Sequence, residues 1–244
     1  MNRDEKLTRA TAMPPARHRL GSRHAIFPSE PTGGTWIGVN DALVTFALIN
    51  WYSVPVRVTG QTVTRGDIVK LALLADSPRL VDQTLTQRPL NSFKPFRLIG
   101  VFFASHSVVE WRWNLNRLER LDHRWQTNNW ISSGFDEPGA QQTRGETFRN
   151  ALRQSSADSV DWLRRLHGSH SPGAGPYSIC MHRDDAATVS YTEISVSRRT
   201  AIMRYRAGSP CCRSPDLSSV TKTLCCSAAA PKTVNRQSVS FRSR

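Results

Sequence analysis

The sequence predicts an α+β protein, an αββα sandwich of two antiparallel sheets, from three observations. Strand-like runs rich in β-branched and aromatic residues occur near the start of the chain, at residues 35–49, and near its end, at residues 187–206. Four segments of helical length and composition lie between them. The chain has 244 residues, enough for one large domain with a sizeable core.

The first strands follow from local signals. Residues 2–9 are expected to form a strand or strand end, and residues 43–49 are a nearly continuous apolar run, typical of a strand buried on both faces. Residues 40–42, Asn-Asp-Ala, supply a turn between this run and the strand at 35–39. Residues 10–31 are expected to be a loop because they contain Pro14, Pro15, Pro28 and Pro31.

Later elements follow from periodicity and length. Helices are expected at residues 68–75, 78–86, 141–154 and 157–167, the second with Ser77 as N-cap and Pro78 at its first position. Strands are expected at residues 96–104, 108–114, 178–182, 187–197 and 199–206.

The chain divides by composition into a folded part, residues 1–207, and a tail, residues 208–244. The tail is rich in Ser, Pro, Thr, Ala and basic residues and lacks periodic apolar positions, which predicts disorder. Four of the five cysteines lie there as adjacent pairs. Adjacent side chains point to opposite sides of an extended chain, whereas zinc sites space paired ligands two to four residues apart, so no metal site is expected. The pairs are Cys211-Cys212 and Cys225-Cys226.

Charge and hydropathy narrow the function classes. The net charge of +14 invites a nucleic-acid interpretation, but the basic residues are dispersed in blocks no longer than two, so nucleic acid is not an expected partner. No apolar run is long enough to span a bilayer, and the first residues do not form a secretory signal. The lack of a signal in these residues and the odd number of cysteines, five, together favour a reducing, cytoplasmic setting.

Two motifs in a fixed order carry a family resemblance. Residues 2–5 read Asn-Arg-Asp-Glu, and residues 33–40 read Gly-Gly-Thr-Trp-Ile-Gly-Val-Asn before the apolar strand. Together they resemble the NRDE family, also called the transport and Golgi organisation family, over roughly the first four-fifths of the chain. That family is similar to the N-terminal-nucleophile hydrolases of the bile-salt hydrolase and acyltransferase branch. The resemblance implies the αββα fold and a chemistry of C–N amide hydrolysis or acyl transfer.

The resemblance also implies roles for individual residues. Asp4 matches the acid that orients the nucleophile, and Asn50 matches the oxyanion donor, although a strand-ending turn residue is the alternative for Asn50. Ser133 stands where that branch carries a supporting Asn. Residues expected to contact substrate are Asn2, Arg3, Arg65 and Trp111, with a surface ion pair as the alternative for Arg65 and a core position as the alternative for Trp111.

The nucleophile itself is not found. Residues 1–5 contain no Cys, Ser or Thr, whereas family members carry a Cys one strand upstream of the Asn-Arg-Asp-Glu motif. We therefore expect that the first strand is missing, that its coding sequence lies upstream of Met1, and that this form does not cleave amides. No cofactor or metal is expected; the expected partner is a small amide or acyl compound.

The alternative is a non-enzymatic binding or trafficking protein on the same scaffold, with haem or a lipid or acyl compound as ligand. Haem would need an axial donor in an apolar pocket, and residues 180–182 read Cys-Met-His. Because side chains alternate along a strand, only Cys180 and His182 of these three would share a face.

Overall fold

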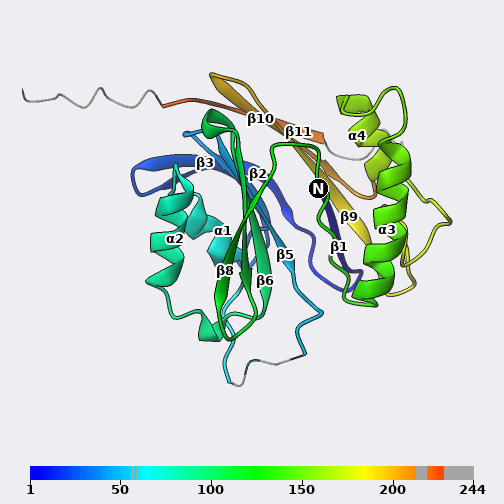
Figure 1. Cartoon of the computed structure of the whole chain (residues 1–244), viewed down its shortest axis with the longest axis horizontal. Coiled ribbons are helices and arrows are strands. Elements are labelled where there is room, and N and C mark those ends of the chain that lie inside the picture. Colours follow the sequence, from blue (N-terminus) through cyan, green and yellow to red (C-terminus); the bar gives the residue numbers. More distant parts are fainter. Residues whose placement is uncertain (56–57, 59, 213–218, 228–244) are drawn as a thin grey trace, which may run out of the picture.

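Two antiparallel sheets pack face to face, with helices on their outer sides, in the computed structural model of the chain (Figure 1), which describes residues 1–55, 58, 60–212 and 219–227. The larger sheet has the strand order β2-β3-β4-β5-β6-β7-β8, and the smaller sheet has the order β1-β9-β10-β11. Helices α1 (Gly66–Ala72) and α2 (Pro78–Thr86) lie on the larger sheet, and α3 (Glu137–Ala151) and α4 (Val160–His167) lie beside the smaller one. The predicted αββα sandwich is confirmed.

The larger sheet is built from strands that are neighbours in sequence. In strand β7, Val109, Trp111 and Trp113 alternate with polar residues and enter one core with the apolar faces of α1 and α2. The strands are β2 (Met13–Leu20), β3 (Arg23–Ser29), β4 (Ile37–Asn40), β5 (Val44–Asn50), β6 (Phe96–Phe102), β7 (Ser107–Trp113) and β8 (Leu118–His123), with 3-10 turns η1 (Leu90–Ser92) and η2 (Phe103–Ser105).

The loop expected at residues 10–31 is wrong, because this stretch forms strands β2 and β3. Strand β2 is at the edge of its sheet, and its pairing with β3 is interrupted between Met13 and Ala16. Pro14 and Pro15 lie in that interruption, where no ladder hydrogen bond is required from them. Strand β8 was not predicted, and residues 178–180 form bends, with one isolated bridge at His182, instead of the predicted strand at 178–182.

Asn40 ties the turn of the β4–β5 hairpin to the end of α1. Its side chain is fully buried, and its Nδ2 donates to the carbonyl oxygens of Leu73 at 3.0 Å and Ala75 at 2.7 Å. Its Oδ1 accepts from the backbone N–H groups of Ala42 and Val44. All the hydrogen-bonding capacity of the amide is thereby used, which makes Asn40 a structural residue.

The smaller sheet joins the two ends of the described chain. Strand β1 (Asn2–Lys6) pairs on one side with β9 (Ala186–Val196), and its other edge pairs with no described strand. Strands β10 (Thr200–Ala207) and β11 (Ser219–Cys225) complete the sheet. The two sheets meet through a small apolar cluster made of Ile26, Val39, Leu43, Ala201, Met203 and Leu224.

The expectation of a disordered tail is wrong for Ser219–Cys225, which forms strand β11 in full antiparallel register with β10. Val220 and Leu224 alternate with polar neighbours, but two apolar positions in seven gave too weak a pattern to predict a strand. The rest of that expectation, for residues 213–218 and 228–244, lies outside the described residues. No described helix combines the length and apolar character needed to cross a membrane.

Candidate functional site

A chain of polar contacts joins strand β1 to the end of strand β5. Arg144 of helix α3 contacts the Oδ2 atom of Asp4 through its Nη1 at 3.3 Å, and the same Nη1 donates to the carbonyl oxygen of Ser132 at 3.4 Å. The Ser132 Oγ donates to the carbonyl oxygen of Asn50 at 2.7 Å. The structure therefore connects the two predicted catalytic residues, Asp4 and Asn50, through Ser132 and an arginine that was not predicted.

Asp4 is held in a desolvated position. Burial raises the pKa of its carboxyl group, and the nearby Arg144 guanidinium and the Thr188 hydroxyl partly offset that rise. Thr188 donates to the Asp4 Oδ1 at 2.6 Å. The Asp4 side chain is 25% exposed and both of its oxygens have a partner, so its carboxyl group is held in a fixed orientation.

Asn50 ends strand β5 and presents its amide toward the surface. Its Nδ2 donates to the Tyr52 hydroxyl at 2.7 Å. Arg65, at the start of α1, lies beside the same tyrosine and donates to the carbonyl oxygen of Pro95 at 3.2 Å. Burial lowers the pKa of Arg65, and Tyr52 partly offsets this shift. Arg65 is thus a neighbour of Asn50, two contacts away through Tyr52.

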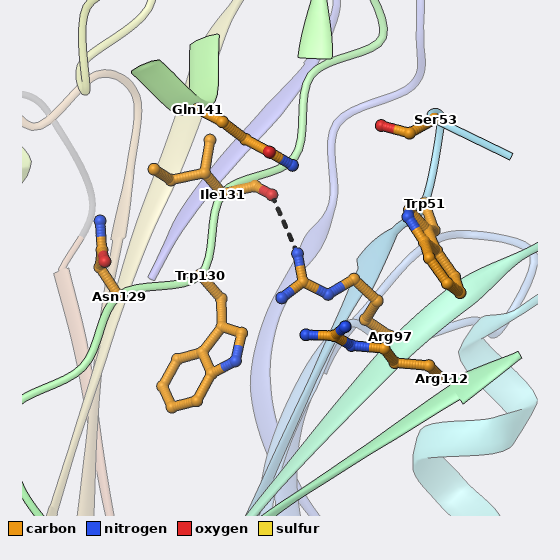
Figure 2. Close-up of a pocket in the computed structure, with 8 residues that line it drawn as sticks. All are labelled: Trp51, Ser53, Arg97, Arg112, Asn129, Trp130, Ile131 and Gln141. Carbon is orange, nitrogen blue, oxygen red and sulfur yellow. Dashed lines mark hydrogen bonds between the residues drawn. The ribbon is translucent and has the colours of Figure 1, made fainter. Parts of the chain in front are cut away.

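A pocket of about 420 Å³ opens beyond the end of strand β5, where Trp51 lines it, and is here named the arginine pocket (Figure 2). The guanidinium groups of Arg97 and Arg112 lie close together in it, between the indole of Trp51 and that of Trp130. Its volume is within the range of about 300–1,000 Å³ common for small-molecule sites. The lining residues are Trp51, Ser53, Arg97, Arg112, Asn129, Trp130, Ile131 and Gln141.

Both arginines are positioned by Glu110 of strand β7, whose side chain is fully buried. Its carboxylate accepts from Arg97 Nε at 2.5 Å, from Arg112 Nε at 3.0 Å and Nη2 at 3.1 Å, and contacts His123 Nε2 at 2.8 Å. Burial alone would raise the pKa of Glu110, but hydrogen bonds from Arg112, Arg97 and His123 outweigh burial and lower it to about 2. Glu110 is thus the carboxylate that contacts both guanidinium groups and holds them at the pocket.

The residues predicted to contact substrate are dispersed. Asn2 donates to the carbonyl oxygens of His167 at 2.9 Å and Ile179 at 2.8 Å, which ties β1 to the end of α4. Arg3 pairs with Glu30 at 2.8 Å and is 8% exposed. Neither lines the arginine pocket.

Trp111 and Ser133 also lie away from the positions expected of them. Trp111 is 1% exposed in the core between sheet and helices, where its Nε1 donates to Asp82 at 2.7 Å, so it presents no surface to a ligand. The Ser133 hydroxyl accepts from the backbone of Phe135, whereas its neighbour Ser132 makes the contact with Asn50.

No described side chain near Asp4 is an activated nucleophile. Cys180 is fully buried, and burial together with Cys211 raises the pKa of its thiol to about 12, so the thiolate is not populated near neutral pH. Thr188 is 1% exposed, and its hydroxyl both donates to Asp4 and accepts from the backbone of Met181. Among the described residues, Asp4 and Asn50 are therefore connected without an activated nucleophile next to Asp4.

Sequence reasoning missed the arginine pocket. Arg97 and Arg112 occupy directly opposite positions on strands β6 and β7, so their proximity depends on strand register. The signal available in the sequence was a charged residue at a polar-face position in each of two apolar strands, together with Glu110 nearby.

The fold of two packed antiparallel sheets resembles that of the N-terminal-nucleophile hydrolases. The chain is similar to an arginine-to-leucine variant of conjugated bile acid hydrolase from Clostridium perfringens, with a TM-score of 0.51 and 9% identity over 92% of this chain and 91% of that one. Two weaker matches follow. One is a cysteine-to-alanine mutant of the same hydrolase, with a TM-score of 0.46 and 9% identity over 90% of this chain and 86% of that one. The other is penicillin V acylase from Agrobacterium tumefaciens, with a TM-score of 0.44 and 12% identity over 86% of this chain and 76% of that one.

The sequence itself identifies the family. A model of the Transport and Golgi organisation 2 family matches residues 1–161. The chain therefore belongs to this family, as the motifs at residues 2–5 and 33–40 indicated. No curated protein matches the chain.

Proposed function

We propose that this chain binds a small organic anion of the acyl or amide class in the arginine pocket, and that it does so without cleaving the amide. The observation that carries the proposal is the pair of guanidinium groups of Arg97 and Arg112, which the buried Glu110 holds side by side in an open pocket. Guanidinium groups match the planar geometry of a carboxylate, so a carboxylate is the anion that this pocket suits best.

The walls of the pocket support an acyl or amide compound. Trp51 and Trp130 offer aromatic surface for an apolar acyl part on either side of the guanidinium groups (Figure 2). The side chain of Gln141, in the pocket wall, is an amide that can pair with a ligand amide. The family's resemblance to amide hydrolases and acyltransferases points to the same ligand class.

Two considerations weigh against other functions. Amide cleavage needs a nucleophile near an oxyanion donor, and the described residues around Asp4 and Asn50 supply none that is both exposed and ionisable near neutral pH. Haem iron takes one or two axial ligands from the protein, whereas Cys180 and His182 belong to a group of four converging donors. All five cysteines are free thiols, which favours the reducing, cytoplasmic setting proposed for this chain.

N-Benzoylglycine, which combines an aromatic acyl group, an amide and a carboxylate, is a suitable probe. Isothermal titration calorimetry at low salt should detect binding to the unaltered chain. Replacing Arg112→Gln should weaken binding by about 10- to 100-fold, the value of one or two charged hydrogen bonds. Arg19→Gln, on the edge strand β2 and outside the pocket, is the matched control and should leave the affinity unchanged.

The same samples test catalysis. Release of glycine from N-benzoylglycine should not be detected. Binding that is insensitive to Arg112→Gln would contradict the assignment of the pocket. Glycine release that is abolished by Asn50→Ala would contradict the assignment as a binding protein and favour an amidase.

A further inference from the structure

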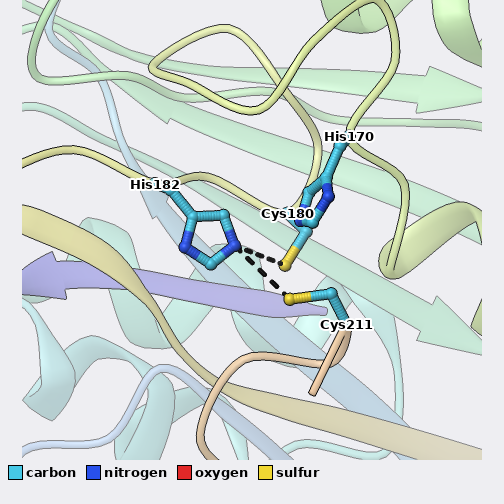
Figure 3. Close-up of side chains that lie close together, drawn as sticks. All are labelled: His170, Cys180, His182 and Cys211. Carbon is cyan, nitrogen blue, oxygen red and sulfur yellow. Dashed lines mark hydrogen bonds between the residues drawn. The ribbon is translucent and has the colours of Figure 1, made fainter. Parts of the chain in front are cut away.

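Four potential metal ligands converge beside the smaller sheet, in a group here named the Cys–His cluster: His170, Cys180, His182 and Cys211 (Figure 3). Their donor atoms all lie within 4.8 Å of one another. The His182 Nε2 is 3.6 Å from the Cys180 Sγ and 3.4 Å from the Cys211 Sγ. The imidazoles of His170 and His182 are 5.0 Å apart between ring centroids.

These separations match a four-coordinate ion. Zinc bound at about 2.3 Å from sulfur and 2.0 Å from nitrogen in a tetrahedron holds its sulfur and nitrogen ligand atoms roughly 3.5 Å apart. The two measured sulfur–nitrogen distances, 3.6 and 3.4 Å, bracket that value. Direct N–H···S hydrogen bonds would account for these two contacts but would leave His170 without a role.

His170 is the second observation that points to a ligand. Its Nε2 atom is buried and has no hydrogen-bond partner in the described chain. A buried polar atom without a partner costs about 1–3 kcal/mol, so native structures seldom leave one unless something binds it. The imidazole of His170 offers a donor nitrogen within 4.8 Å of the donor atoms of the other three residues.

The backbone holds the three contributing segments in place. The Cys180 N–H donates to the carbonyl oxygen of Ser169 at 2.9 Å, which keeps Cys180 next to the loop that carries His170. The Gly208 N–H donates to Val189 at 2.8 Å, and the Ser209 Oγ donates to Thr188 at 2.7 Å. These bonds anchor the segment that leads to Cys211, so the donor geometry is set by the fold.

We propose that the Cys–His cluster is a structural zinc site with His170, Cys180, His182 and Cys211 as its ligands. Two thiolates and two imidazoles form a donor set that suits Zn²⁺, and four protein ligands leave no open position for catalysis. Binding releases the two thiol protons to solvent, because the thiolate is the ligand form. The ion would fasten the loop after α4 and the approach to β9 to the segment after β10.

Metal analysis of the full 244-residue chain, purified under reducing conditions and dialysed against Zn²⁺, tests the proposal. One equivalent of zinc should remain, and Co²⁺ in its place should give the intense visible absorption of tetrahedral thiolate coordination. His170→Ala should weaken zinc affinity by at least about 100-fold, because even outer-shell changes cost 10- to 100-fold. Cys225→Ser, at an exposed cysteine outside the cluster, is the control and should keep the metal.

Cys212 requires a second variant, because its Sγ lies 3.9 Å from the Cys211 Sγ and could replace it. Cys211→Ser is therefore made alone and together with Cys212→Ser, and the double variant should lose the cobalt absorption. Circular dichroism confirms that each variant is folded. Three outcomes would overturn the proposal. The unaltered chain fails to retain zinc, or His170→Ala and the double cysteine variant both retain it, or a Cys180–Cys211 disulfide persists under reducing conditions.

Discussion

The arginine pocket and the Cys–His cluster lie beside different sheets and satisfy their polar groups in opposite ways. In the pocket, the Glu110 carboxylate contacts Arg97, Arg112 and His123, and both arginines line an open cavity. In the cluster, four donors face one another, and His170 keeps a buried nitrogen without a partner among the described residues. The charged groups of the pocket are paired within the protein, and its arginines can also bind an anion. The donors of the cluster gain a common partner only when the proposed zinc ion binds.

The largest effect is expected when the internal partner of the pocket is removed. Glu110→Gln would leave Arg97 and Arg112, which are 12% and 31% exposed, without their counter-charge. Breaking a buried ion pair from one side costs about 3–5 kcal/mol, and the free energy of unfolding in urea should fall by that amount.

The control for this change is Asp122→Asn, at an exposed acid of strand β8 paired with Arg120. It should change the free energy of unfolding by no more than about 1 kcal/mol. A similarly small loss in Glu110→Gln would show that the arginines turn to solvent and that the pocket is not organised by this residue.

Acid should weaken the same centre by a slightly smaller amount. The pKa of Glu110 is lowered from 4.5 to about 2, so its contribution is fully present above pH 4.5 and is lost as the pH falls toward 2. A shift of this size corresponds to about 3 kcal/mol. Urea unfolding measured between pH 5 and pH 2 should show a shallower loss of stability in Glu110→Gln than in the unaltered chain; parallel curves would contradict the assignment.

A smaller effect separates two adjacent serines at the link between Asp4 and Asn50. Ser132→Ala removes the hydrogen bond to the Asn50 carbonyl and should cost about 1 kcal/mol of stability. The Ser133 hydroxyl accepts only one contact, from the backbone N–H of Phe135 at 3.3 Å. Ser133→Ala should therefore lower the free energy of unfolding by less than about 0.5 kcal/mol. Thermal unfolding of the two variants under the same conditions compares them; the reverse order would favour the role that the family resemblance implied for Ser133.

The sequence predicted best what is local. The apolar run at residues 43–49 and the Ser77-Pro78 start of α2 have strong signals within a few residues, and both elements are present. The prolines at residues 10–31 predicted a loop wrongly, because an edge strand with interrupted pairing tolerates them and the sequence does not show which strand is at the edge.

The sites depend on contacts that no short stretch contains. The resemblance indicated Asp4 and Asn50, yet the residues that connect them, Arg144 and Ser132, come from a helix and a loop far along the chain. The side chains of Cys180 and His182 lie 3.6 Å apart, as the alternation of side chains along a strand suggested, although no strand forms there. The composition around Cys211 predicted disorder. Its position next to Cys180 and His182 depends on the path of the chain after β10, which the composition does not show.

A crystal structure of the chain with N-benzoylglycine tests the proposed function most directly, because it locates the ligand. We expect the ligand carboxylate within hydrogen-bond distance of Arg112 and Arg97, with the benzoyl ring against Trp51 or Trp130 and the amide toward Gln141. A ligand ordered elsewhere on the protein, with the arginine pocket filled only by solvent, would contradict the proposal.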